Sequence, residues 1–113
     1  MGKSSIHMCL EEQGSMCFYC KKELRVDQAT VDHFIPKAAG GTNSHLNKVA
    51  ACKQCNGNKG DSMPTESQLL KLHECKIEFF MRLTQTHKDP AKAKALFFKA
   101  VLGEGITINS EVI

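Results

Sequence analysis

The spacing of apolar positions changes about halfway along this 113-residue chain. Before residue 62 the apolar residues form short runs separated by glycine, proline and polar turns, whereas after it they recur at helical spacing. Gly14, Pro36 and Gly60 each follow one of the short runs and predict where it ends. The first part therefore predicts a helix, two strands and a second helix, over residues 4–13, 29–35, 49–51 and 52–59.

The second part predicts two longer helices. Thr65 to Gln68 form a capping box, so a helix should begin there and run to about His87. Asp89-Pro90 is an N-cap followed by a first-turn proline, which predicts another helix to about Leu102. Because the connection is short, the two helices should pack as an antiparallel hairpin. Residues 104–113 predict a short strand or a loose tail.

Composition narrows the class of protein only in part. The net charge of +3 is too small to argue by itself for a nucleic-acid partner. Met1 to Ser5 leads into no apolar run of signal-peptide length, and no segment is long enough to span a membrane. We therefore expect a cytoplasmic chain, in which six cysteines bind metal more readily than they form disulfides.

Four of the cysteines form two Cys-x-x-Cys pairs, Cys17/Cys20 and Cys52/Cys55, which are separated by residues 21–51. Two such pairs can hold one tetrahedral zinc ion, with iron in the same four-thiolate cage as the alternative. A zinc ion held by four thiolates has no open position, so the predicted zinc is structural. The metal would stabilise a half of the chain that is too polar to fold on apolar burial alone.

Asp32-His33 lies between the two cysteine pairs, and Asn56 follows the last cysteine directly. These residues provide the parts of a second, catalytic metal site. Strand alternation places Asp32 on the face opposite His33, so a bulge or a strand end would be needed to bring both to one phosphate.

The complete pattern resembles the HNH endonuclease family, in particular its zinc-bearing branch in phage and bacterial defence nucleases. The resemblance covers residues 17–60 and is carried by these motifs: Val31-Asp32-His33-x-x-Pro36, Gly40-Gly41, Asn47 five residues before Cys52, and Cys52-x-x-Cys55-Asn56-x-x-Lys59-Gly60. The family often has a histidine where this chain has Asn56.

The resemblance implies a ββα-metal fold and a role for each residue. Asp32 and Asn56 would bind one divalent cation, with magnesium or manganese expected. His33 would be the general base, and Asn47 would orient the His33 ring by a hydrogen bond. Lys59 would contact a backbone phosphate of the substrate. The resemblance implies DNA as the substrate, with RNA as the less expected alternative.

Other residues are expected to be structural. His45 should be an exposed loop residue, and His7, His73 and His87 should lie on helix surfaces or ends. Cys9 and Cys75 remain as small buried residues or inert thiols. The cations of the helical hairpin should form a solvated face, with phosphate contact as the alternative: Lys71, Lys76, Arg82, Lys88, Lys92, Lys94 and Lys99.

The sequence thus predicts an α+β protein with a nuclease module at residues 1–62 and a helical hairpin at 63–113, packed as a single compact domain. The predicted function is metal-dependent hydrolysis of DNA by a monomer or homodimer. The alternative is a non-catalytic, zinc-ribbon-like module that binds nucleic acid or protein.

Overall fold

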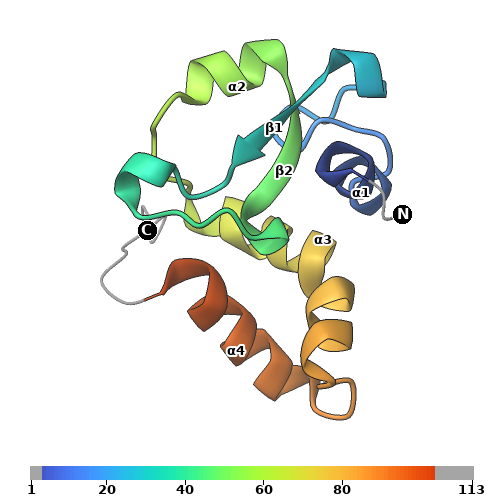
Figure 1. Ribbon diagram of the computed structural model, residues 1–113, viewed down its shortest axis with the longest axis vertical. Coiled ribbons are helices and arrows are strands. Elements are labelled where there is room, and N and C mark those ends of the chain that lie inside the picture. The colour runs from blue at the N-terminus through green and yellow to red at the C-terminus, as the bar shows by residue number, and fades with distance from the viewer. Residues whose placement is uncertain (1–3, 104–113) are drawn as a thin grey trace.

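The computed structural model describes residues 4–103, and Figure 1 shows a small β-hairpin surrounded by helices. The expected strand or tail at 104–113 lies outside the described residues. In chain order the elements are α1 (Ser5–Glu12), η1 (Val26–Gln28), β1 (Ala29–His33), η2 (Lys37–Ala39), η3 (His45–Asn47), β2 (Lys48–Cys52), α2 (Lys53–Lys59), α3 (Glu66–Thr84) and α4 (Pro90–Leu102). The α+β fold predicted from the sequence is confirmed.

The two strands pair antiparallel in regular register, with Asp32 opposite Val49 and His33 opposite Lys48. β1 ends at His33, two residues before the predicted end, because the next backbone groups bond to Asn47 instead of continuing the ladder. Phe34 N–H donates to Asn47 O at 2.7 Å, and Ile35 N–H donates to Asn47 Oδ1 at 2.8 Å. His33 is therefore at a strand end, and the hairpin contains no bulge between Asp32 and His33.

The predicted helical hairpin is present, although α3 ends at Thr84, about one turn before the expected His87. Thr65 accepts from Gln68 N–H and thereby forms the expected capping box. The Asp89 side chain caps α4 by accepting from Lys92 N–H. Within the hairpin, His73 packs against Phe97 and Phe98 with ring centroids 5.4 Å away in each case, so its predicted place on the helix surface is wrong.

The hairpin completes the main hydrophobic core. Buried residues from the β-hairpin region and from both long helices form one cluster: Phe18, Phe34, Ile35, Leu46, Val49, Leu69, Leu72, Phe80, Phe97 and Val101. A second cluster lies between α1, the cysteine pairs and β2, and includes Leu10, Leu24 and Ala51. Apolar burial thus joins α3 and α4 directly to the segment that contains Asp32 and His33.

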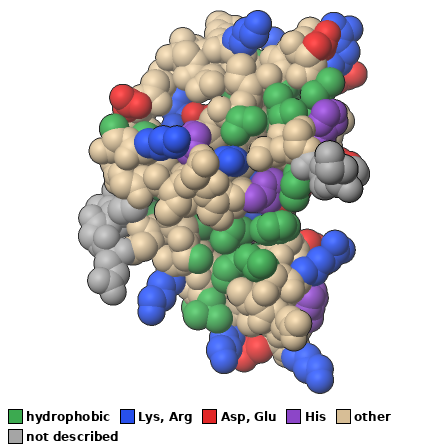
Figure 2. Space-filling view, in the orientation of Figure 1, with side chains coloured by type: hydrophobic (Ala, Val, Ile, Leu, Met, Phe, Trp, Pro, Cys, Tyr) green, Lys and Arg blue, Asp and Glu red, His purple; other side chains and the backbone are tan. Residues whose placement is uncertain are grey.

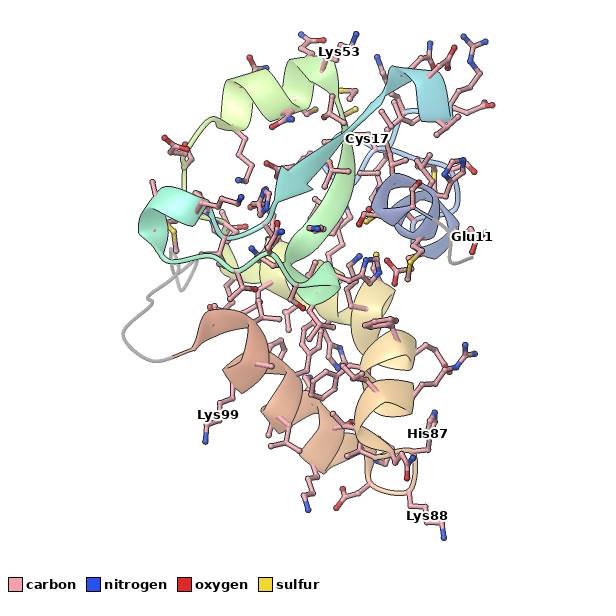
Figure 3. All side chains as sticks on the ribbon, in the orientation of Figure 1. Glu11, Cys17, Lys53, His87, Lys88 and Lys99 are labelled. Atoms are coloured by element: carbon pink, nitrogen blue, oxygen red, sulfur yellow. The ribbon has the colours of Figure 1, made fainter. Side chains whose placement is uncertain are left out.

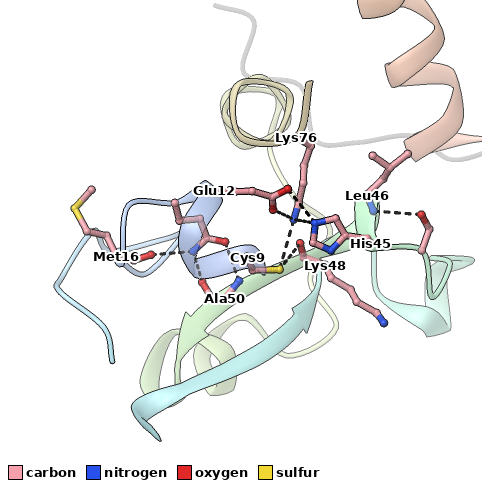
Figure 4. Close-up of polar contacts among 10 residues, drawn as sticks. Cys9, Glu12, Met16, His45, Leu46, Lys48, Ala50 and Lys76 are labelled. Carbon is pink, nitrogen blue, oxygen red and sulfur yellow. Dashed lines mark hydrogen bonds and ion pairs between the residues drawn. The ribbon is translucent and has the colours of Figure 1, made fainter. Parts of the chain in front are cut away.

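A buried polar cluster fastens α1 to α3 (Figure 4). The Lys76 side chain is 0% exposed, and its Nζ lies 2.5 Å from Glu12 Oε1, 3.4 Å from His45 Nε2 and 3.5 Å from Cys9 Sγ. Burial raises the pKa of the Cys9 thiol, which donates to Lys48 O at 3.3 Å. Cys9, Glu12 and His45 are grouped closely enough to bind a metal ion, but the Lys76 ammonium lies among them and supplies the positive charge.

Two sequence expectations are wrong at this cluster. His45 is not an exposed loop residue, because its Nε2 contacts Glu12 Oε2 at 2.9 Å and its ring packs on Phe79. Lys76 is not on a solvated face and cannot contact a phosphate without leaving the core. Lys88 and Lys99, in contrast, point away from the body of the protein as expected (Figure 3).

Candidate zinc centre and candidate active site

The four cysteines of the two pairs come together at the end of the β-hairpin. Their sulfur atoms all lie within 4.8 Å of one another, and Cys20 Sγ is 4.0 Å from Cys52 Sγ. In a tetrahedral zinc site with Zn–S bonds of 2.3 Å, sulfur atoms are about 3.8 Å apart. The cluster therefore has the size and the donor set of a four-thiolate zinc site.

Backbone N–H groups around the cluster favour ionised thiols. Cys52 N–H donates to Cys17 Sγ and Cys55 N–H donates to Cys52 Sγ, each at 3.4 Å. Burial opposes ionisation of Cys17, but hydrogen bonds from backbone N–H groups outweigh it and lower the pKa of that thiol to about 7. Burial and the neighbouring sulfur atoms raise the pKa of Cys55 to about 12. Complete ionisation of the four thiols thus needs a bound cation, as expected of a metal centre.

The Asp32 carboxylate is buried at the end of β1, where it has two partners. The Tyr19 hydroxyl donates to Asp32 Oδ2 at 2.5 Å, and Lys59 Nζ lies 3.5 Å from the same oxygen. Lys59 also donates to His33 O at 3.0 Å. Lys59, expected at a DNA phosphate, is therefore engaged within the site, where it links α2 to both residues of the Asp32-His33 pair.

Asn56 faces β1 from the helix α2. Its Nδ2 donates to Thr30 Oγ1 at 2.9 Å, and Thr30 Oγ1 in turn donates to Ala51 O at 2.9 Å. Because the single hydroxyl proton of Thr30 goes to Ala51, Thr30 must accept from Asn56, which fixes the orientation of the Asn56 amide. The Oδ1 atom of Asn56 is thereby directed away from Thr30. Together with the carboxylate of Asp32 it offers oxygen donors, which suit a hard divalent cation.

The His33 ring is bonded to Asn43 rather than to Asn47. His33 Nε2 lies 3.0 Å from Asn43 Oδ1, an oxygen that can only accept, so Nε2 carries the proton. In this tautomer Nδ1 has the lone pair that can take a proton from water. The sequence motif pointed to Asn47, by its place five residues before Cys52, and gave no role to Asn43.

Asn47 fastens the loop after β1 and makes all its side-chain hydrogen bonds within residues 4–103 to backbone groups. Its Oδ1 accepts from Ile35 N–H, and its Nδ2 donates to Ile35 O at 3.0 Å and to Thr42 O at 2.9 Å. The expected hydrogen bond between Asn47 and the His33 ring is therefore not present, because both polar atoms of the Asn47 amide bond to backbone groups. Gly41 is required beside it, since a Cβ there would lie 1.7 Å from Ile35 O.

Tyr19 and Thr30 are the other site residues that sequence reasoning missed. Tyr19 lies inside the first cysteine pair, in Cys17-Phe18-Tyr19-Cys20, and burial and Asp32 raise its pKa far above the ordinary value. Thr30 lies two residues before Asp32, and period-two alternation places both on one strand face. That alternation was a usable signal for Thr30, whereas nothing in the sequence pointed to Tyr19.

The fold and the site define a small β-hairpin and helix module with a four-cysteine metal centre and an Asp-His pair at a strand end. Residues 17–69 match the HNH endonuclease family. The matching part of the chain therefore belongs to the HNH endonuclease family, as the sequence resemblance implied.

Curated relatives include the CRISPR-associated endonuclease Cas9 of Corynebacterium diphtheriae, which is 33% identical over 57 residues, 50% of this chain and 5% of the relative. The Cas9 endonuclease of Actinomyces naeslundii is 37% identical over 54 residues, 47% of this chain and 5% of the relative. This chain thus corresponds to a small part of each of these proteins.

Among solved structures, the Type II-C Cas9 enzyme from Actinomyces naeslundii has a similar fold, with a TM-score of 0.53 and 22% sequence identity. The match covers 96% of this chain and 13% of that one. Since the family match ends at residue 69, this likeness extends the fold comparison into the C-terminal helices. Within residues 4–103, no helix has the length and apolar character needed to cross a membrane.

Proposed function

We propose that this chain is a divalent-metal-dependent endonuclease that hydrolyses DNA phosphodiester bonds. The observation that carries the proposal is the arrangement around the end of β1: the Asp32 carboxylate held by Tyr19, the Asn56 amide on α2, and the His33 ring bonded through Nε2 to Asn43. The family membership of residues 17–69 and the endonuclease relatives support it.

In this proposal His33 is the general base. Asn43 holds the proton on Nε2, so Nδ1 accepts a proton from the attacking water and directs the water oxygen to the phosphorus. A divalent cation bound by Asp32 and Asn56, with magnesium or manganese expected, would supply Lewis-acid charge at the phosphate and leaving oxygen. Lys59 adds positive charge beside Asp32 and keeps β1 and α2 together.

Beside the candidate site, the surface is hollowed between α2 and the start of α3. The hollow has a volume of about 350 Å³, and its lining includes Tyr19 and Lys59, the two partners of Asp32, but none of the proposed catalytic residues Asp32, His33 and Asn56. On the face seen in Figure 2, Lys and Arg side chains are spread over separate places instead of forming one basic patch. We nevertheless expect limited sequence preference, with contact mainly to backbone phosphates. Service in phage or bacterial defence is part of the same proposal, supported by the Cas9 relatives.

A plasmid-cleavage assay tests this function. Purified protein is incubated with supercoiled DNA and magnesium, manganese or EDTA, beside the His33→Ala variant. His87→Ala is the matched control, because His87 is an exposed histidine at the far end of the helical hairpin (Figure 3). We expect metal-dependent relaxed or linear product, and a loss of about 100-fold or more in His33→Ala alone.

The cleavage products also distinguish a monomer from a homodimer and DNA from RNA as the substrate. Relaxed circles alone indicate nicking by a monomer, whereas direct linear product indicates paired active sites in a homodimer. Cleavage of RNA in preference to DNA would correct the substrate class. Retained activity in His33→Ala would overturn the role of His33 as the general base. No product from a folded, zinc-loaded protein under any metal would overturn the nuclease function and favour the non-catalytic binding module.

A further inference from the structure

Tyr19 connects the zinc centre to the candidate catalytic site. It lies between Cys17 and Cys20, and its ring packs edge-on against Phe18 with centroids 5.1 Å apart. The backbone of this segment is fixed to the sheet, since Phe18 N–H donates to Ala50 O at 3.0 Å. From this position the Tyr19 hydroxyl reaches Asp32 Oδ2 at 2.5 Å.

We propose that Tyr19 is a positioning residue: its hydroxyl holds one oxygen of Asp32 so that the other is presented to the catalytic cation. The inference rests on the proposed function, because it assigns the Asp32 carboxylate to a divalent cation. Tyr19 itself touches neither the cation nor the substrate, and acts through Asp32.

The distribution of contacts on the carboxylate supports this role. Both Tyr19 and Lys59 approach Oδ2, and no side chain within residues 4–103 donates to Oδ1. A carboxylate rotates about its terminal bond, so two contacts on one oxygen fix where the second oxygen points. Because the phenol donor is neutral, it restrains Asp32 without cancelling the negative charge that a cation needs.

The placement of Tyr19 also makes cation binding depend on zinc. The two cysteines that flank Tyr19 belong to the four-thiolate cluster, so an occupied zinc site fixes the backbone from which the phenol projects. Without zinc the segment loses this anchor, and Asp32 loses its short hydrogen bond. The zinc ion thus affects catalysis only indirectly, because it holds Tyr19 in place and Tyr19 orients the Asp32 carboxylate.

The Tyr19→Phe variant tests the inference, because it keeps the ring and removes only the hydroxyl. Manganese binding is measured from the electron paramagnetic resonance signal of free Mn²⁺, in the zinc-loaded wild-type protein and in the variant. We expect binding that is weaker by about 10- to 100-fold, the usual effect of removing a partner of a metal ligand. Thr84→Val is the control, since it removes a hydroxyl that donates to Phe80 O, away from the site.

Cleavage kinetics provide a second measurement on the same variants. In Tyr19→Phe the magnesium concentration for half-maximal rate should rise by the same factor as the manganese dissociation constant, and excess magnesium should restore most of the rate. A merely structural role would instead lower the zinc content and the melting temperature and leave the cation affinity of the folded protein unchanged. Zinc content and melting temperature are therefore recorded for each variant.

The fluorescence of Tyr19 provides a direct signal of its contact with Asp32, because the chain contains one tyrosine and no tryptophan. Its fluorescence in the wild-type protein should change on addition of magnesium, with the same dissociation constant as the kinetic effect. In Asp32→Asn the emission should not respond to magnesium. A response that persists in Asp32→Asn would overturn the assignment.

Failure of the inference can be told from failure of the proposed function. If the wild-type protein cleaves DNA and Tyr19→Phe binds manganese with unchanged affinity, Tyr19 has no positioning role and the nuclease function stands. If the wild-type protein binds manganese but does not cleave, the nuclease function fails and the comparison of affinities still decides the role of Tyr19. Absence of manganese binding by the wild-type protein overturns the inference outright.

Discussion

Replacement of Asn47 by alanine should destabilise the protein severely, although Asn47 contacts no metal ligand through its side chain. The side chain is 1% exposed and closes the loop between β1 and η3 by three hydrogen bonds to the backbone. Alanine would leave all three backbone partners without their donor or acceptor.

The size of the destabilisation depends on whether each of these backbone groups is exposed or buried. Thr42 is exposed, so water can replace the lost bond to its carbonyl at little cost. Ile35 is buried, and its N–H and C=O would both be left unsatisfied, at about 1–3 kcal/mol each. The sum is about 2–6 kcal/mol, a large part of the roughly 5–15 kcal/mol that holds a domain folded.

The matched variant is Asn43→Ala, four residues earlier on the same loop. Asn43 is exposed and bonds to His33 Nε2, so its loss should change the free energy of unfolding by no more than about 0.5 kcal/mol. It should nevertheless slow DNA cleavage, because the His33 ring loses the acceptor that sets its tautomer.

Denaturant unfolding in the presence of zinc gives the stability of both variants, and the plasmid assay gives their activity. Asn47→Ala should lower the free energy of unfolding, whereas Asn43→Ala should lower only the rate of DNA cleavage. An Asn47→Ala protein that unfolds within about 1 kcal/mol of the wild type would refute the account of the loop, since even one unsatisfied buried group costs about that much.

Three further changes test other parts of the structure. Lys76→Met should lower the free energy of unfolding, measured in denaturant, by about 3 kcal/mol. This is the low end for a broken buried ion pair, because Glu12 is 16% exposed. Adding Glu12→Gln should recover part of the lost stability, since it removes the unpaired charge. Gly41→Ala should abolish folding or displace the loop, which circular dichroism and thermal melting would detect, because its Cβ would overlap Ile35 O; a normal melting curve would contradict this. Chelation of zinc, or Cys52→Ser, should unfold the protein in parallel with measured zinc loss, and a zinc-free protein with native circular dichroism would show that the metal is dispensable.

Local signals in the sequence were sufficient to predict the α-helices, the two strands and the grouping of the four cysteines. Capping residues such as Thr65 and Asp89 act within one helical turn, so they marked the starts of α3 and α4 correctly. The two cysteine pairs carry their own spacing, and the strand end at His33 was one of two stated solutions for the Asp-His pair. Each of these features depends on residues close together in the chain or on a repeated motif.

The contacts that sequence reasoning missed join distant positions. Lys76 is 64 positions from Glu12 and 31 from His45, so no periodicity could show that this lysine is buried. Asn47 was expected beside the His33 ring, where the structure places Asn43, because only the folded loop decides which amide points inward. The bond between Tyr19 and Asp32 likewise depends on how the first cysteine pair packs over the sheet.

The Glu12–Lys76 pair determines how much of the chain would have to accompany the family motif if it were transferred to another protein. The family match spans residues 17–69, so it excludes both charged partners but retains His45. A graft limited to that span would bring an imidazole and an apolar sheet face into solvent, with neither α1 nor the rest of the hairpin to cover them. The smallest transferable unit is therefore set by the helices on both sides of the motif, and a host protein must either accept those helices or provide equivalent ones.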